Sequence, residues 1–225
     1  MPITVAYLHT SHVLIPLFTA LTNKELPDVE QFHMVDESLI KNTIRNGSLT
    51  KTTIRRVLGM VQLAREGGAD AVVVTCSSIG PAARLARRLF EFPVIRVDEP
   101  MAEKAVRSGR RIGVAATLRT TLEPTVALLR EKAQAEHRQV DLVESLCENA
   151  FEAVISGDTG THDRLLSDAL LRLMDEVDVI VLAQASMARV VDSLPSRRVP
   201  ILTSPELAVQ QTRAILYAES LAGVH

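Results

Sequence analysis

The feature that most constrains the fold of this chain is the regular alternation of short apolar runs with segments of helical period. The apolar runs lie at Ile3–Leu8, Gln31–Val35, Ala71–Thr75, Val94–Val97, Ile112–Ala115, Gln139–Val143, Val179–Leu182 and Val199–Leu202. Most are continuously apolar, which is typical of strands in a parallel sheet that is covered on both faces. Between them, apolar residues recur at helical spacing, as in the stretch from Ile54 to Ala64. This alternation predicts βαβ units and therefore an α/β fold built on parallel sheets.

Two stretches of the chain, residues 70–93 and 178–200, resemble each other in order and spacing. Each opens on an aspartate and an apolar strand, continues into small residues, and reaches a proline that is followed by two apolar residues. Any βαβ protein shows some echoes of this kind, but the shared aspartate and proline positions favour a true duplication. We therefore expect two similar α/β domains, the first formed by residues 1–98 plus 205–225 and the second by residues 99–204.

Composition excludes several classes of protein. Apolar residues make up 47% of the chain, and 25 basic residues against 27 acidic ones leave a net charge of −2. That balance predicts a packed core and no nucleic-acid or anionic membrane surface as a partner. Two cysteines are too few for a disulfide scaffold, and no apolar run reaches the length of a membrane span. The first residues lack the pattern of a signal peptide, so we expect a cytoplasmic location.

Small polar residues gather in four loops that follow predicted strands and precede predicted helices. In parallel sheets, ligands bind beyond the carboxyl ends of the strands, and helix N-termini suit carboxylates or phosphates. The alternative is that these residues are ordinary helix caps. The candidate binding residues are Thr10, Ser11, Thr75, Ser77, Ser78, Thr117, Arg119, Thr120, Thr121, Ala185 and Ser186. Arg119 is a candidate carboxylate clamp, or else a solvated arginine at a helix start.

Cys76 is the strongest candidate for a catalytic group in these loops. A thiol at a strand end and just before a helix can have its pKa lowered by the local field. The thiolate could then remove a proton from carbon or add to an electrophile. The alternative is a buried apolar cysteine, although the neighbours of Cys76 form a polar turn. Cys147 is expected to have a packing role only.

Other polar residues gave weaker hypotheses. His9 and His12 are three positions apart, but no third ligand has a convincing place, so we expect no metal site. Either histidine could instead act as an acid, cap a helix or lie at the surface. Asp36 could pair with Arg45 or Arg119, or simply begin a helix. A glycine-rich phosphate loop and a dinucleotide fingerprint are both lacking.

Four segments together carry a resemblance to a known family. Val73–Ser78, Ile112–Thr117, Val181–Met187 and the run from Val199 to Pro205 resemble, in this order, the motifs of the aspartate/glutamate/hydantoin racemase superfamily. The resemblance covers nearly the whole chain. It implies two pseudosymmetric parallel-sheet α/β domains with the active site in the cleft between them. It also implies a small carboxylate substrate, no cofactor, a homodimer, and two cysteines on opposite faces of the substrate carbon.

The chain departs from that pattern at Gln184, which stands where the second cysteine of the family is expected. A primary amide cannot exchange a proton with carbon near neutral pH, but it can donate hydrogen bonds to a carboxylate or an enolate oxygen. The superfamily includes arylmalonate decarboxylase, which manages with one cysteine, and maleate isomerase, which uses the first-half cysteine as a nucleophile. We therefore expect a cofactor-independent racemase, isomerase or decarboxylase that uses Cys76. The alternative is a non-catalytic protein that binds a carboxylate metabolite.

Overall fold

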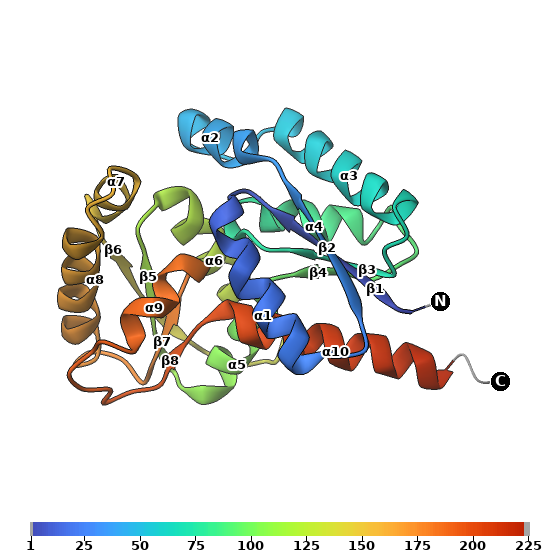
Figure 1. The fold of residues 1–225 in the computed structure, drawn as a ribbon. Coiled ribbons are helices and arrows are strands. Elements are labelled where there is room, and N and C mark those ends of the chain that lie inside the picture. The colour runs from blue at the N-terminus through green and yellow to red at the C-terminus, as the bar shows by residue number, and fades with distance from the viewer. Residues whose placement is uncertain (1, 223–225) are drawn as a thin grey trace. The chain divides into compact units, whose positions relative to one another are not determined.

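Two parallel sheets of four strands each organise the chain, one in each of two compact units. The computed structural model describes residues 2–222. One unit contains the residues up to Asp98 together with those from Pro205 onward, and the other is Glu99–Ser204. Helices flank both sheets (Figure 1). The prediction of an α/β fold with two parallel-sheet domains is confirmed.

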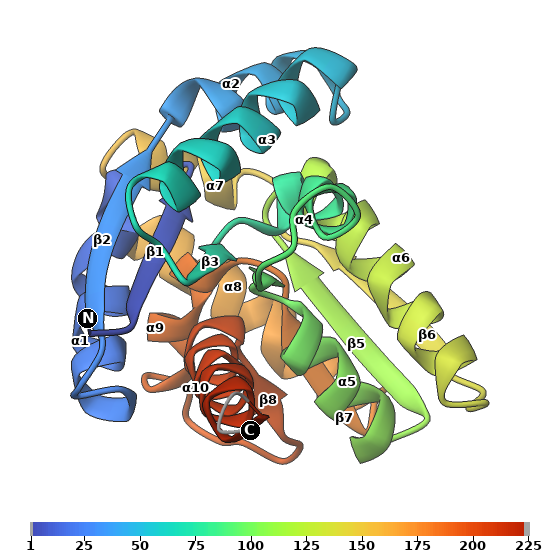
Figure 2. The same cartoon turned by 90° about the vertical axis from the view of Figure 1, so that its right-hand side faces the viewer.

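The first sheet has the strand order β2-β1-β3-β4, and all neighbours are parallel. Its strands are β1 (Thr4–His9), β2 (Glu30–Val35), β3 (Ala71–Val74) and β4 (Val94–Arg96). Its helices are α1 (Ile15–Glu25), α2 (Glu37–Asn46), α3 (Lys51–Glu66), α4 (Gly80–Ala86) and α10 (Ser204–Ala222), with short 3-10 turns η1 (His12–Leu14) and η2 (Ser77–Ile79). Figure 2 shows α2 and α3 side by side.

Alternate residues of β1 explain why this strand is apolar throughout. Ala6 and Leu8 belong to one buried cluster, with residues of α3 and α4. Val5 and Tyr7 belong to a second cluster on the other face, with residues of α1 and α10. Because successive side chains of a strand point to opposite faces, a sheet covered on both faces requires apolar residues at every position.

The second sheet repeats the topology of the first, in the order β6-β5-β7-β8. Its strands are β5 (Arg111–Ala116), β6 (Asp141–Leu146), β7 (Val179–Leu182) and β8 (Ile201–Leu202). Its helices are α5 (Glu99–Ser108), α6 (Arg119–Ala135), α7 (Ala150–Ile155), α8 (Thr159–Leu173) and α9 (Ala188–Val191), with the 3-10 turn η3 (Ala185–Met187). None of the helices within residues 2–222 is long and apolar enough to cross a membrane.

The aspartates that open the two repeated stretches have the same structural task. An oxygen of Asp70 accepts a hydrogen bond from the backbone N–H of Thr4 at 2.9 Å. An oxygen of Asp178 accepts from the N–H groups of Arg110 and Arg111, each at 2.8 Å. In both units the aspartate therefore ties the start of the third strand to the start of the first.

Two strands differ from their predicted ranges by more than one residue at an end. The run predicted at Gln139–Val143 forms β6 two residues later, because His137 has a φ of 52° and the chain completes a turn before the strand begins. The run predicted at Val199–Leu202 is shortened to β8, because Pro200 has no N–H to donate to a neighbouring strand. Both sheets keep their predicted place in the chain.

Candidate functional site

Each sheet has a point at which the direction of winding changes. The chain runs from β1 outward to β2 and then crosses to β3 on the other side of β1. In the second unit, β5 and β7 have the same relation. Ligands of parallel α/β sheets bind beyond the carboxyl ends of such a strand pair. The loops that follow these four strands carry the residues selected from the sequence.

Cys76 lies directly after β3 and precedes the turn η2. Its backbone is extended, with φ −124° and ψ 120°. The side chain is half-buried and packs against the apolar cluster beneath α3 and α4. Its sulfur has no hydrogen-bond partner among the residues that the structure describes. The thiol is thus anchored by packing and keeps its hydrogen-bonding capacity for another molecule.

The loop after β1, the strand next to β3, carries Thr10 and Ser11. Thr10 is buried and Ser11 is half-buried. Within residues 2–222, neither hydroxyl has a hydrogen-bond partner. Two neutral donors are therefore available beside the strand end that carries Cys76.

Three further predicted binding residues of this unit are buried, namely Thr75, Ser77 and Ser78. The hydroxyl of Thr75 donates to the carbonyl oxygen of Leu8 at 3.0 Å, and its N–H donates to the same oxygen. Thr75 therefore joins the ends of β3 and β1. Its predicted contact with substrate stays a prediction, as do those of the two serines.

Gln184 occupies in the second unit the place that Cys76 has in the first. It follows β7, precedes η3, and has a φ of −124° and a ψ of 133°. Its Oε1 accepts hydrogen bonds from the N–H of Thr117 at 2.6 Å and from the Thr117 hydroxyl at 3.0 Å. Because a backbone N–H can only donate, these bonds fix which end of the amide is oxygen. The Nε2 group has no partner in the described part of the chain, so it can donate to another molecule.

The N-terminus of α6 provides further donors in the same unit. Leu118, the residue that caps this helix, offers no side-chain acceptor to its first N–H groups. The hydroxyl of Thr120 is buried and has no hydrogen-bond partner among the described residues. Arg119 is exposed, and its guanidinium is 3.9 Å from Glu123. The N–H groups of a helix start, a hydroxyl and a guanidinium together suit a carboxylate.

The remaining predicted residues of this unit contribute less. Thr121 is buried, and its carbonyl oxygen accepts from the Thr125 hydroxyl at 2.9 Å. Ala185 is buried and Ser186 is exposed. Neither observation tests their predicted contacts with substrate.

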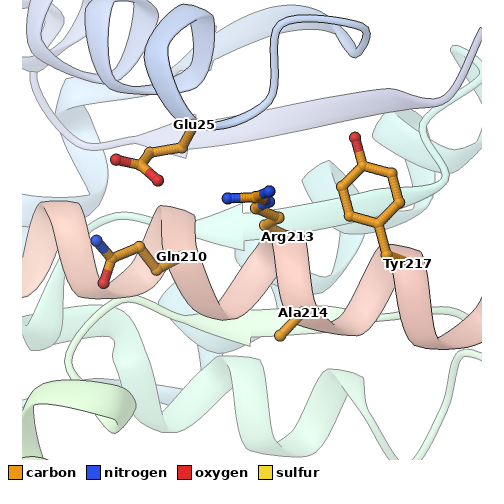
Figure 3. Close-up of a pocket in the computed structure, with 5 residues that line it drawn as sticks. All are labelled: Glu25, Gln210, Arg213, Ala214 and Tyr217. Carbon is orange, nitrogen blue, oxygen red and sulfur yellow. The ribbon is translucent and has the colours of Figure 1, made fainter.

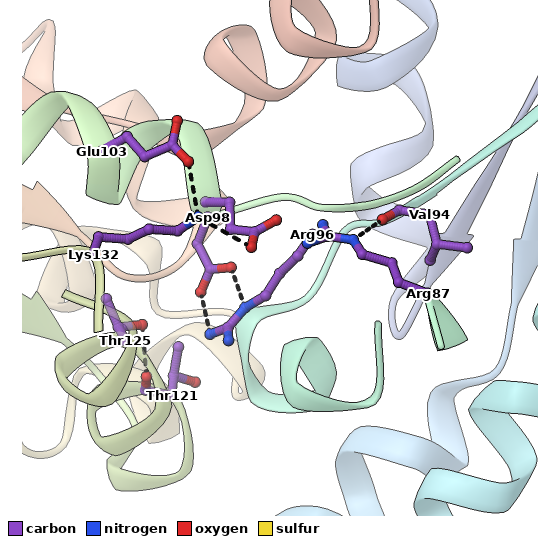
Figure 4. A network of polar contacts seen from close by, with 9 residues as sticks. Arg87, Val94, Arg96, Asp98, Glu103, Thr121, Thr125 and Lys132 are labelled. Atoms are coloured by element: carbon purple, nitrogen blue, oxygen red, sulfur yellow. Dashed lines mark hydrogen bonds and ion pairs between the residues drawn. The ribbon is translucent and has the colours of Figure 1, made fainter. Parts of the chain in front are cut away.

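A buried ion pair that the sequence analysis missed lies beneath the Cys76 turn. The guanidinium of Arg96 donates to Asp98 from Nε at 2.6 Å and from Nη2 at 2.9 Å (Figure 4), and both side chains are almost fully buried. Gly80, the first residue of α4, lies against this guanidinium so closely that a Cβ would overlap Arg96 Nε. The pair therefore supports the backbone that follows Cys76.

The family model described as Asp/Glu/Hydantoin racemase matches residues 9–212. The chain belongs to the Asp/Glu/hydantoin racemase family. No curated protein matches the chain at the sequence level. The model match includes both strand-end loops described above.

Solved structures of racemases have the same fold as this member of the family. Glutamate racemase isoform RacE1 from Bacillus anthracis superposes with a TM-score of 0.75 at 20% identity, covering 97% of this chain and 83% of that one. Allantoin racemase from Klebsiella pneumoniae superposes with a TM-score of 0.72 at 18% identity, covering 96% of this chain and 89% of that one. Aspartate racemase from Picrophilus torridus superposes with a TM-score of 0.69 at 12% identity, covering 94% of each chain. At these identities the likeness establishes the fold, and the named substrates belong to those proteins.

The hypothesis that Asp36 pairs with Arg45 or Arg119 was wrong, and the alternative, that it begins a helix, is confirmed. Asp36 does begin a helix, since it accepts from Ser38 N at 3.0 Å, but its ion pair is with Arg56 and not with Arg45 or Arg119. His12 lies 2.7 Å from a carboxylate oxygen of Glu37. Within residues 2–222, no group of three or more acidic, histidine or cysteine side chains could hold a metal ion.

Cys147 has the packing role that was predicted. It is buried in the apolar cluster of the second unit, with residues of α8 and β7. Burial raises the pKa of its thiol to about 11. Cys147 is therefore a poor source of thiolate near neutral pH.

A cavity of about 560 Å³ lies between α1 and α10, away from these loops (Figure 3). Its lining residues are Glu25, Gln210, Arg213, Ala214 and Tyr217. Glu25 is the last residue of α1, and the chain then passes to the start of β2. The cavity therefore opens near the amino ends of the strands, opposite the ends that carry Cys76.

Proposed function

We propose that this racemase-family chain is a cofactor-independent enzyme that acts at the carbon next to a carboxylate of a small acid or amino acid. Cys76 transfers the proton, and the Gln184 amide is assigned the stabilisation of the charge that develops. The family assignment supports the reaction class. The half-buried, unengaged thiol of Cys76 supports its role, whereas Cys147 is buried in the core.

The orientation of the Gln184 amide is the observation that carries the proposal furthest. Its oxygen is held by Thr117, so the group left for the substrate is Nε2, which can only donate. Such a donor stabilises the oxygen anion that forms when a proton leaves the neighbouring carbon, or when carbon dioxide does. It cannot itself remove or return the proton. The proposed chemistry is therefore one-sided, with Cys76 acting on a single face of the intermediate.

Carboxylate recognition is assigned to the neutral donors and to Arg119. In the first unit, the hydroxyls of Thr10 and Ser11 are assigned to carboxylate binding. In the second unit, the N-terminus of α6 and Thr120 have this role. Because the strand-end loops of both units carry carboxylate-binding donors, the proposed substrate class includes acids with two carboxylates. Decarboxylation of a malonate-type acid is a one-sided reaction of such a substrate, because the Cys76 thiol supplies the proton that replaces carbon dioxide on carbon. Isomerisation of an unsaturated diacid is another, in which the Cys76 thiolate adds to one carbon of the double bond and leaves again after rotation about the resulting single bond.

Incubation in deuterium oxide tests the proposal. Amino acids, malonates and unsaturated diacids are each supplied as a panel, and products are followed by NMR and chiral chromatography. We expect deuterium at the carbon next to the carboxylate, with product of one configuration. Equal exchange and interconversion of both enantiomers would show a second proton-transferring group and overturn the one-sided mechanism. Failure of every compound to exchange, isomerise or lose carbon dioxide would overturn the carbon-acid proposal itself.

Gln184→Ala should lower kcat by about 10²- to 10³-fold, the effect of removing one preorganised donor to an oxygen anion. KM should change much less, because the bond strengthens as charge develops. Gln184→Glu should be at least as damaging, because it places a carboxylate beside the developing anion. Thr117→Val is the matched control, since it removes one support of the amide and keeps the N–H bond, so its effect should be smaller. An unchanged kcat in Gln184→Ala would contradict the assigned role.

A further inference from the structure

A chain of side-chain hydrogen bonds connects α1, β2 and β1 to the residue before Cys76. His9, the last residue of β1, is fully buried. Its Nε2 lies 2.9 Å from Nδ1 of His33 on β2, and its Nδ1 lies 2.9 Å from the hydroxyl oxygen of Thr75. The other nitrogen of His33, Nε2, lies 3.0 Å from the hydroxyl oxygen of Thr19 on α1.

The Thr75 hydroxyl determines which atom is the donor in every hydrogen bond of this series. The Thr75 hydroxyl gives its only proton to the Leu8 carbonyl, so it must accept from Nδ1–H of His9. In a neutral His9, Nε2 is then an acceptor, and His33 must donate from Nδ1. His33 Nε2 in turn accepts from Thr19. One arrangement satisfies all these groups, and in it both imidazoles are neutral.

The surroundings of the pair favour this neutral state. Burial, together with the adjacent His33, lowers the pKa of His9 to about 4, and burial also lowers the pKa of His33. Tyr7 stacks on both rings, with centroids 6.2 Å from His9 and 5.4 Å from His33. Burial raises the pKa of Tyr7 to about 12, so it is neutral as well. A proton added to His9 Nε2 would face the Nδ1–H of His33, donor against donor.

The second unit joins the equivalent strand ends by a different side-chain bond. In the second unit, Gln184 itself ties the two strand ends together by accepting from Thr117. The residues equivalent to His9 and Thr75 are there Ala116 and Ala183, which have no such side chains. In the first unit, the side-chain bond between the two strand ends is made one residue earlier, by His9 and Thr75. The side chain of Cys76 therefore takes no part in joining the strands.

We infer that His9 and His33 are positioning residues, which hold the Thr75 hydroxyl and so fix the strand end from which Cys76 projects. The inference rests on the proposed function for its catalytic consequence. The reactivity of the Cys76 thiol can be measured without any substrate. The positioning role and the proposed function can therefore be refuted separately.

The test measures alkylation of Cys76 by iodoacetamide as a function of pH, read by peptide mass spectrometry, beside kcat and KM. Thr75→Val removes the hydroxyl and keeps the shape. His33→Phe keeps a ring in the stack and removes the donor to His9. We expect each variant to change the pH profile of alkylation and to lower kcat by about 10- to 100-fold, as small misplacements of a reacting group do. His9→Asn, whose side-chain amide can replace the Nδ1 donor, should retain more activity than His9→Leu.

Folding is followed by circular dichroism, and the buried Cys147 serves as an internal reference for opening of the chain. If Thr75→Val does not fold, His33→Phe carries the same test. The inference is overturned if folded Thr75→Val or His33→Phe keeps both the wild-type alkylation profile and kcat. It is also overturned if activity falls only as Cys147 becomes equally reactive, because the role is then structural. An altered profile in a protein with no detectable turnover would support positioning and refute the proposed function.

Discussion

Cys76→Ala should abolish turnover, lowering kcat by roughly 10⁴-fold, while affinity for the carboxylate ligand changes little. Positioned acid–base groups contribute up to about 10⁴-fold, and the other thiol of the chain, Cys147, is buried in the core of the second unit. Cys76→Ser should be nearly as inactive, because a serine hydroxyl is not ionised near neutral pH. The side chain is half-buried and makes no hydrogen bond within the described residues, so both variants should fold. Product formation and calorimetric binding measure the two effects separately.

Cys147→Ala is the matched control for this experiment. It removes the other thiol of the chain from the core of the second unit, and it should change stability without changing kcat. Turnover retained in Cys76→Ala would place the chemistry on another group. A protein that binds carboxylates in both forms, and turns over none, would instead be the non-catalytic binding protein that the sequence left as the alternative.

The sequence predicted the scaffold because each of its signals is local. A strand covered on both faces must be apolar at every position, and such runs are visible without knowing what covers them. The repeat predicted that Cys76 and Gln184 occupy equivalent places, and their backbone angles agree closely. The larger errors in strand range are at β6 and β8. A positive φ at His137 decides where β6 begins, and the missing N–H of Pro200 decides where β8 begins.

The contacts of the candidate site were harder to predict, because they join residues that are distant in sequence. Nothing in the spacing of His9 and His33 marks them as a pair, since they meet only when β1 and β2 lie side by side. That Thr117 holds a carboxylate stays a prediction; in the structure both of its donors are directed at Gln184. The choice between ligand and neighbour depends on side-chain direction, which strand order alone does not give.

The ion pair between Arg96 and Asp98 could have been predicted from the sequence. An arginine at the end of a short apolar strand, with an aspartate two positions later, places both side chains on the same side of the chain. A charged residue within an otherwise buried strand calls for a partner, because an unpaired buried charge is strongly unfavourable.

Arg96→Met should destabilise the first unit by about 3–5 kcal/mol. The change leaves the carboxylate of Asp98 fully buried without its guanidinium, and breaking a buried pair from one side has this large effect. Chemical unfolding followed by circular dichroism measures the loss as a lower midpoint at constant slope. Arg56→Met is the matched control, because it breaks the much more exposed pair with Asp36 and should change stability by less than about 1 kcal/mol.

The double variant Arg96→Met with Asp98→Leu separates stability from function. Replacing both charges by apolar groups of similar size should recover most of the lost stability, since the desolvation penalty disappears together with the attraction. Turnover should not recover with it, because Gly80 lies against the Arg96 guanidinium and a flexible methionine cannot hold the turn after Cys76 in the same way. Full recovery of both would show that the ion pair acts on folding alone. Recovery of stability with low kcat would show that the buried charges fix the position of the loop that carries the thiol.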